Sequence, residues 1–411
     1  PPAHSLKLVA DSKSMLVQQY WDIERAEVYE GSVGDAVEKF RELFLTSVKR
    51  RLRSDVSLGT SLSGGLDSSS IVAAINGVSG LLNGHNCFSA SFPGFDKDES
   101  TFAKKVTDQF ALTGNFAKPS AEGFIEDFKK LCFHHESPFG SSSVYAQYKV
   151  FELAKEKGVK VLLDGQGADE MLAGYQKYIH WWLQELLFKR KFLSYRKEKK
   201  AFELNKVKWN WNVKNRIAAF VPGMTALELQ SRASKKLKRI PGISQAFLHA
   251  YYDFDFCNKP IVRELNDILY YNTLQFGLEE LLIYADRNSM AHGREVRLPF
   301  LNHELVEFVF SLQSSYKMKD GYTKWILRES IKKELPAEIT WRTDKIGFEP
   351  PQNEWMNHPS LRDLVLESRK KLITAGILKK DLLQNPVIPQ AAFAEDNYDW
   401  RYLVAGTLIS I

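Results

Sequence analysis

The sequence predicts an α/β fold in which a parallel β-sheet is covered by helices on both faces. Between residues 35 and 164, short apolar runs typical of strands alternate with segments of helical periodicity. Strands that alternate with helices of about 10 or more residues are joined by crossover connections, and these connections produce a parallel sheet. The chain is also long enough for such a fold, because 411 residues, 44% of them hydrophobic, bury one large core or two smaller ones.

The expected elements follow one another in a regular order. Apolar residues at spacings of three and four predict a first helix in AVEKFRELFLTSVKRRL, from about residue 35. Strands are expected near 56–62, in NCFSASF (86–92), in NFAK (115–118) and in VKVLLD (159–164). The helices between them are expected in SSIVAAIN (69–76), in STFAKKVTDQF (100–110), near 121–132 and near 142–157.

Beyond about residue 175 the chain becomes rich in aromatic residues and lysines, which predicts an added helical C-terminal part. Basic stretches of this kind occur in nucleic-acid-binding proteins, but lysines at helical spacing are more typical of a solvated face above a packed one. We therefore expect no nucleic-acid partner. The tryptophans of this region are expected to pack between helices, namely Trp181, Trp182, Trp209 and Trp211.

Bulk properties exclude several other classes of protein. Three widely separated cysteines, Cys87, Cys132 and Cys257, fit neither a disulfide framework nor a zinc site. No apolar run reaches the roughly 20 residues that span a bilayer, and the first residues do not resemble a signal peptide. These observations predict a cytoplasmic protein without a membrane partner. The formal net charge of +6 is compatible with an anionic small-molecule substrate.

The stretch SLSGGLDSSS, residues 61–70, lies between an expected strand and an expected helix. Gly64 and Gly65 permit close approach of a ligand to the backbone, and the N-terminus of the following helix attracts anions. The stretch therefore predicts a phosphate-binding loop, although an ordinary strand-to-helix turn with a capping side chain is the simpler alternative. It matches neither the GxxxxGK[ST] pattern of P-loop proteins nor the GxGxxG pattern of dinucleotide-binding folds.

The SGGLDSS loop resembles the pyrophosphate-binding loop of the N-type ATP pyrophosphatases, which have the adenine nucleotide alpha hydrolase-like fold. Further motifs extend the resemblance to the synthetase domain of bacterial glutamine-dependent asparagine synthetases. They span roughly residues 35–355, in the order SLSGGLDSSSIVAA, FSASF, DKDESTFAKKV, ESPFGSSSVYAQY, VKVLLDGQGADEMLAGY, DRNSMAHGREVRLPFLNHELVEF, GYTKWILRESIKKELPAEI and WRTDKIGFEPP.

The resemblance implies a set of site residues for ATP and Mg²⁺. Pyrophosphate would be held by Ser63, Gly64, Gly65, Asp67 and Ser68. Leu62 and the strand from Ser89 to Phe92 would line the adenine side, and Gly165 would approach the ribose. Asp67 and Asp169 would share Mg²⁺, with a first-turn helix acid as the alternative role for Asp169. Lys324 would act at the phosphates, with a solvated helix lysine as the alternative.

One position departs from the family pattern. Gln166 stands where many members carry Glu or Asp and lactam-forming relatives carry Tyr, and an amide cannot act as a base. We expect Gln166 to orient ammonia or the acyl group, with proton removal left to solvent, phosphate or Glu170. Arg294 and Arg297 are candidates for binding a substrate carboxylate or for structural ion pairs.

Other polar residues receive weaker assignments. Glu136 and Ser141–Ser143 are placed at the border of the aspartate or ammonia pocket by the resemblance alone. His134 and His135 are expected to be structural, because adjacent residues on a helix point about 100° apart and do not easily meet one metal ion.

The implied reaction joins aspartate and ammonia at the expense of ATP, through β-aspartyl-AMP, and gives asparagine, AMP and pyrophosphate. Two alternatives stay open, which are a related ligase that adenylates another carboxylate (a surface-sugar uronate, a lactam or a peptide ring) and a non-catalytic nucleotide-binding module. Residues 1–30 resemble the end of an N-terminal glutaminase domain and its linker, and residues 31–411 the synthetase domain. The glutaminase itself is absent from this chain, and a homodimer is compatible with the sequence.

Overall fold

The computed structural model describes residues 2–9, 14–24, 28–80, 84–207, 209–253, 257–344 and 347–411. Its centre is a five-stranded sheet in the order β5-β4-β3-β6-β7, and every neighbouring pair is parallel. The strands are β3 (Leu58–Ser61), β4 (Asn86–Ala90), β5 (Thr113–Ala117), β6 (Val161–Leu163) and β7 (Glu295–Arg297). The predicted α/β class with a parallel sheet is therefore confirmed.

Helices bury both faces of this sheet in two separate hydrophobic clusters. Neighbouring residues of one strand enter different clusters: Cys87 packs with the first and Phe88 with the second, and Leu163 and Leu162 divide in the same way. This alternation follows from the strand geometry, in which successive side chains point to opposite faces. The helices that contact the strands are α2 (Leu66–Ser79), α3 (Ser100–Gln109), α5 (Ser143–Glu156) and α13 (Leu278–Ala291). Helix α1 (Val33–Arg51) packs on α2, and α4 (Ala121–His135) packs on α5 and α13.

The strand order creates a topological switch point between β3 and β6. After β3 the chain moves through α2 to β4 and then to β5, and it returns through α4 and α5 to β6 on the other side of β3. The loops that follow β3 and β6 therefore lead away in opposite directions. A crevice at the carboxyl ends of two such strands is the usual ligand site of an open α/β sheet.

The sequence did not predict β7. This strand has only three residues, Glu295, Val296 and Arg297, and just one of them is apolar, so its pattern does not stand out from a loop. It forms because Val296 pairs with Leu162 at the edge of the sheet. A second short pair, β8 (Met318–Lys319) with β9 (Tyr322–Thr323), forms an antiparallel hairpin next to the site.

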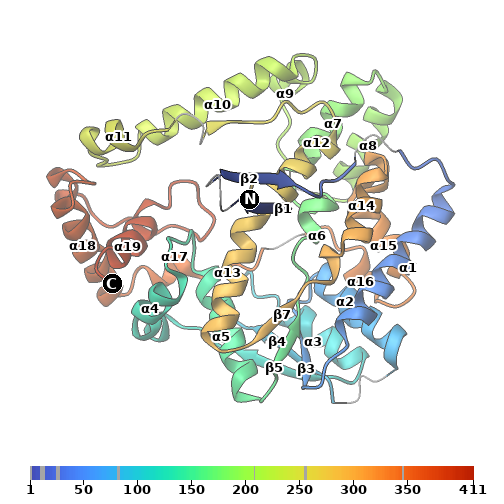
Figure 1. Ribbon diagram of the computed structural model, residues 1–411, viewed down its shortest axis with the longest axis horizontal. Coiled ribbons are helices and arrows are strands. Elements are labelled where there is room, and N and C mark those ends of the chain that lie inside the picture. The colour runs from blue at the N-terminus through green and yellow to red at the C-terminus, as the bar shows by residue number, and fades with distance from the viewer. Residues whose placement is uncertain are drawn as a thin grey trace.

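The remaining helices form the expected helical part. They are α6 (Ala168–Met171), α7 (Tyr178–Phe188), α8 (Phe192–Leu204), α9 (Val213–Ala218), α10 (Pro222–Lys238), α11 (Gln245–Tyr251), α12 (Leu265–Tyr270), the π-helix Tyr271–Gln275, α14 (His303–Ser311), α15 (Trp325–Ile331), α16 (Ala337–Thr340), α17 (Gln352–Trp355), α18 (Pro359–Thr374) and α19 (Tyr398–Leu408). Figure 1 shows α9, α10 and α11 along the edge of the molecule opposite β3, β4 and β5. No described helix is both long and apolar enough to cross a membrane.

Several expectations about single residues are met. Trp182 is buried, and Trp181, Trp209 and Trp211 pack against the first hydrophobic cluster, so the predicted packing role of the tryptophans is confirmed. All three cysteines are buried free thiols. His135 is buried and bonds Asn288, which is a structural role, as expected.

Near the N-terminus, β1 (His4–Val9) and β2 (Ser14–Gln19) pair as an antiparallel hairpin. Both strands are exposed along nearly their whole length. The following segment is tied to the main body, because Trp21 donates a hydrogen bond to Glu307 and Tyr270 donates one to Asp22. The assignment of residues 1–30 to the end of a preceding domain stays a prediction.

Candidate active site

A cleft of about 620 Å³ opens where β3 and β6 end. Its walls come from the loops after these two strands, from α5 and from the segment that joins β9 to α15. Most of the site residues predicted from the sequence line it, namely Leu62, Ser63, Gly65, Asp67, Ser68, Ser89, Gly165, Gln166, Asp169, Glu170 and Lys324. The structure thus brings together residues that are more than 250 positions apart in the chain.

Gly64 and Phe92 are not among the lining residues. Gly64 has φ +78°, and a Cβ there would lie 2.3 Å from the backbone nitrogen of Ala103, so this glycine seats the loop directly against α3. Phe92 follows the end of β4 and packs in the second hydrophobic cluster, with its ring 6.2 Å from that of Trp355. The roles of these two residues at the nucleotide stay predictions.

The loop after β3 is organised by its own serines. The hydroxyl of Ser68 accepts from the backbone amide of Ser63 at 3.2 Å, and the hydroxyl of Ser63 accepts from the amide of Gly65 at 3.2 Å. Helix α2 starts directly afterwards with Gly65 as its N-cap, and no side chain caps it. The first-turn amides thus lack the side-chain cap of an ordinary turn, and a helix end of this kind is suited to an anion.

The two loops touch each other at Gly165. A Cβ at this position would lie 3.0 Å from the Cβ of Asp67 and 3.2 Å from the backbone nitrogen of Ser68. A larger residue would push the loops apart. Glycine is therefore required for the close approach that brings Asp67 and Asp169 to the same end of the cleft.

Lys324 joins these two aspartates. Its Nζ lies 2.6 Å from both carboxylate oxygens of Asp67 and 2.6 Å from Oδ1 of Asp169. The lysine side chain is only 5% exposed. Burial alone would lower the pKa of Lys324, but the two carboxylates outweigh it and the pKa is raised, so the amine is held charged. This environment is unlike that of a solvated helix lysine.

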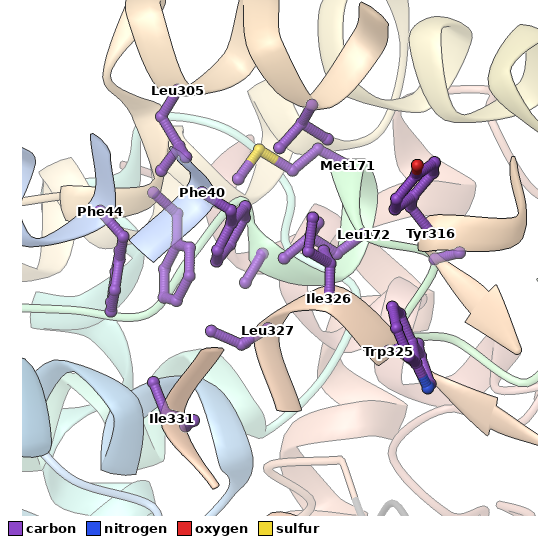
Figure 2. Close-up of a cluster of buried hydrophobic side chains, with 14 of the residues drawn as sticks. Phe40, Phe44, Met171, Leu172, Leu305, Tyr316, Trp325, Ile326, Leu327 and Ile331 are labelled. Carbon is purple, nitrogen blue, oxygen red and sulfur yellow. The ribbon is translucent and has the colours of Figure 1, made fainter. Parts of the chain in front are cut away.

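Hydrophobic packing holds Lys324 in place. Helix α15 follows the lysine and is buried, and Figure 2 shows its apolar side chains in one cluster with side chains of α1 and α6. The labelled members are Phe40, Phe44, Met171, Leu172, Leu305, Tyr316, Trp325, Ile326, Leu327 and Ile331. The backbone of Lys324 has φ +53° and its amide donates to the carbonyl of Leu172, so the lysine is tied to the helix that carries Asp169.

Gly174 is a site residue that the sequence analysis missed. A Cβ there would lie 1.8 Å from Oδ1 of Asp169 and 2.1 Å from Cε of Lys324. Only glycine leaves room for this ion pair. The signal was present in the motif DGQGADEMLAGY, where Gly174 follows the acidic pair by a few residues, but the sequence does not show which side chains meet there.

Asp164 is a second missed residue, at the end of β6 and on the wall of the cleft. Burial raises the pKa of its carboxyl to about 6, although hydrogen bonds from the backbone amides of Gly165 and Gln166 oppose the rise. Arg342 is a third. It lines the cleft, pairs with Glu99 at 2.8 Å, and lies 3.8 Å from the ring centre of Phe102.

Gln166 and Glu170 differ in their surroundings. Glu170 is buried and accepts a hydrogen bond of 2.6 Å from the hydroxyl of Tyr175, whose pKa is raised by burial and by this carboxylate. Oε1 of Gln166 is buried and finds no hydrogen-bond donor among the described residues. The amide of Gln166 thus retains an unused acceptor at the wall of the cleft.

The two candidate arginines for a substrate carboxylate have structural roles. Arg294 is buried and donates to the backbone carbonyls of His292 and Val159. Arg297 pairs with Glu295 and donates to the backbone carbonyl of Arg51. Neither arginine lines the cleft.

Of the residues predicted to border the aspartate or ammonia pocket, only some line the cleft. Ser143 lines the cleft and its hydroxyl lies 2.6 Å from that of Ser141. Ser142 instead donates its backbone amide to Gln352 at 2.8 Å. Glu136 pairs with Arg287 outside the cleft. Residues 345 and 346 of the motif WRTDKIGFEPP lie outside the described residues.

In the parts of the chain that the structure describes, no group of three or more His, Cys, Asp or Glu side chains is arranged to hold a metal ion. Two carboxylates nevertheless converge on one cation, the amine of Lys324. A magnesium ion is commonly held by one or two carboxylates together with substrate phosphates and water. The donor set of Asp67 and Asp169 therefore fits Mg²⁺ bound together with a nucleotide.

Comparison with known proteins agrees with this geometry. Residues 39–402 match the family model described as asparagine synthase. The chain is 26% identical to asparagine synthetase (glutamine-hydrolyzing) 1 of Bacillus subtilis, over 88% of this chain and 57% of that protein. It is 24% identical to the amidase chyE of Penicillium rubens, over 86% of this chain and 58% of that protein.

The chain thus spans a little over half of the length of these relatives. A shorter match, 33% identical over 44% of this chain and 34% of the relative, is to a putative asparagine synthetase (glutamine-hydrolyzing) 2 of Methanocaldococcus jannaschii. Because the family model covers most of the chain, including both loops and Lys324, this protein belongs to the asparagine synthase family.

Proposed function

We propose that this chain is the synthetase part of an ATP-dependent, amide-forming ligase, and that it makes asparagine from aspartate, ATP and ammonia. The observation that carries the proposal is the contact of Lys324 with Asp67 and Asp169 at the end of the loop after β3. A single cation between two carboxylates, beside an anion-binding helix end, suits a site that must hold and neutralise phosphates.

In the first step, the β-carboxylate of aspartate attacks the α-phosphorus of ATP. The bond between the α and β phosphates breaks, and the products are β-aspartyl-AMP and pyrophosphate. Ser63, Gly65 and Ser68 supply backbone and hydroxyl donors to the leaving pyrophosphate. Lys324 would neutralise the charge that develops on the bridging oxygen, because its buried amine lies at this end of the cleft.

Asp67 and Asp169 would hold Mg²⁺, which supplies neutralisation of the phosphate charge when it is bound. Leu62 and Ser89 would face the adenine, and Gly165 would leave room for the ribose. The main contribution of the protein is positioning, because two bound substrates at the correct distance react far faster than free ones.

In the second step, ammonia attacks the acyl carbon of β-aspartyl-AMP, and AMP leaves. The unused acceptor of Gln166 is suited to an N–H of the incoming ammonia, which it would orient without removing a proton. Glu170 is bonded to Tyr175, so proton removal falls to this pair, to solvent or to phosphate. The ammonia would come from a glutaminase domain, to which residues 1–30 would be the connection.

The test is a product assay with MgATP and ammonium, with and without aspartate. We expect asparagine, AMP and pyrophosphate in equal amounts, and only when aspartate is present. Asp169→Asn should abolish the reaction, whereas the matched change Asp363→Asn on the exposed face of α18 should not. ATP cleavage that does not depend on aspartate would reject asparagine synthesis.

A second candidate is a related ligase that adenylates another carboxylate. It is favoured by Gln166, which replaces the acid common in the family, and by the relatives at 24% identity that are named amidases. The same assay with panels of uronates, amino acids and peptides separates the two candidates, because each predicts pyrophosphate release with a different acceptor.

A further inference from the structure

Positive charge is concentrated in one part of the chain, residues 189–239, which we call the basic arm. It holds 16 of the 56 Lys and Arg residues but only three of the 50 Asp and Glu residues. Its formal net charge is therefore +13, whereas the rest of the chain carries −7 and the whole chain +6. The formal charge is therefore unevenly distributed along the chain, although Lys189, Lys197 and Lys236 pair with acidic residues outside the arm.

The basic arm consists of α8, α9, α10 and their connections. Figure 1 shows α9 and α10 along the edge of the molecule opposite β3, β4 and β5. The arm also exposes large apolar side chains. These are Phe192 (50% exposed), Leu193 (83%), Leu204 (70%), Val213 (65%), Ile217 (60%), Phe220 (54%), Met224 (69%) and Leu227 (66%).

Helix α10 has clearly different inner and outer sides. Ala226 and Ser234 are buried against the protein. Met224 and Leu227 are exposed, and Lys235 and Lys238, also exposed, each lie eleven residues further on, about three turns along the same side of the helix. The outer side thus carries exposed apolar side chains in its first half, beside the Glu228–Arg232 ion pair, and lysines in its second half. Exposed apolar groups next to cationic ones mark an interaction surface.

We propose that the basic arm binds an anionic phospholipid surface. Apolar side chains gain free energy by entering the region between lipid headgroups and acyl chains, and lysines near the surface are attracted by acidic headgroups. A nucleic acid would use the charge but would leave Leu193, Met224 and Leu227 in water. In this proposal the arm lies on the membrane surface and does not cross the bilayer. This inference departs from the sequence-based expectation that the protein has no membrane partner.

The test is flotation of the full chain with phospholipid vesicles. At low salt we expect binding to phosphatidylcholine vesicles that contain about 30% phosphatidylglycerol, and at least tenfold weaker binding to pure phosphatidylcholine. Binding should also fall in roughly 1 M NaCl, where the Debye length is about 3 Å. Equal binding to both kinds of vesicle, or none to the acidic ones, would overturn the proposal.

Variants separate the electrostatic contribution to lipid binding from the apolar one. Lys235→Glu with Lys238→Glu, and Met224→Ser with Leu227→Ser, should each weaken binding at least tenfold, since each pair removes one of the two attractions. Folding should be unchanged because these side chains are exposed, and circular dichroism checks it. The matched control is Lys157→Glu with Lys160→Glu, also exposed lysines but outside the arm. If the control pair lost as much binding as the arm pairs, or if only nucleic acid bound, the assignment to lipid would be wrong.

Discussion

Replacement of Lys324 by methionine tests the central ion pair of the site. Methionine has nearly the same length as the lysine stem and keeps its packing, but it removes the cation that Asp67 and Asp169 share. The two carboxylates then face each other without a counter-charge. We expect loss of adenylation and, in addition, a less stable protein.

The size of the stability loss follows from burial. Loss of one partner of a buried ion pair typically costs about 3–5 kcal/mol. The carboxylate side chains of Asp67 and Asp169 are 19% and 16% exposed, so water reaches them, and one of them can take up a proton. We therefore expect the free energy of unfolding to fall by about 2–3 kcal/mol near pH 7.

The dependence on pH gives a second readout. The pKa of Lys324 is raised by the fold, so its stabilising effect is fully present below its usual pKa and is lost only at more alkaline pH, above its raised value. In the variant, acid protonates the facing carboxylates and relieves their repulsion. The difference in unfolding free energy between wild type and Lys324→Met should thus shrink as the pH falls.

Urea unfolding at several pH values measures this difference. The control is Lys332→Met, whose pairing with Glu329 is exposed and should contribute about 0–1 kcal/mol. Binding of Mn²⁺ in the absence of nucleotide should become tighter in Lys324→Met, because the amine no longer competes for the two carboxylates. The reasoning is refuted if Lys324→Met unfolds like the control at all pH values, or if Mn²⁺ binds more weakly.

Three further expectations concern single positions. Gly64→Ala should lower the free energy of unfolding by about 2 kcal/mol or more and should weaken nucleotide binding, because φ is +78° and the new Cβ meets Ala103. The control, Gly77→Ala, has open space around it in the following helix α2 and should be neutral or stabilising in thermal unfolding. His292 is buried, and burial is the main reason that its pKa is lowered to about 4. The free energy of unfolding should therefore decrease as the pH falls from about 6.5 to about 4, since the unfolded chain binds the proton first. In urea unfolding, a His292→Gln variant should lose this part of the pH dependence of the unfolding free energy. Gln166→Glu should change the pH–rate profile of amide formation if this position contacts the nucleophile, and an unchanged profile would exclude a role in proton transfer.

The sequence was sufficient to predict four of the five strands of the sheet, the two loops and most of the lining residues. The reason is that strand-to-helix loops at a switch point have distinctive glycines and acids, as in the loops that carry Asp67 and Asp169. The family resemblance added Lys324, which no local pattern marks, because its contact with the loops depends on the packing of α15 and not on sequence distance.

The missed features depend on three-dimensional contacts. Gly174 matters only because Asp169 and Lys324 meet at its Cα, and β7 is a strand only because β6 is beside it. Phe92 was expected near the adenine, but the chain turns after β4 and its ring enters the core against Trp355. The sequence also did not predict the exposed apolar side of α10, because periodicity alone does not show whether another element covers a helix face.

The exchange of labelled pyrophosphate into ATP tests the central claim most directly, because it reports reversal of the adenylation step without any need for ammonia. With Mg²⁺ and aspartate we expect label to enter ATP, and we expect Asp169→Asn to abolish the exchange. Formation of ADP and phosphate in place of AMP and pyrophosphate, or exchange that survives Asp169→Asn unchanged, would contradict the account.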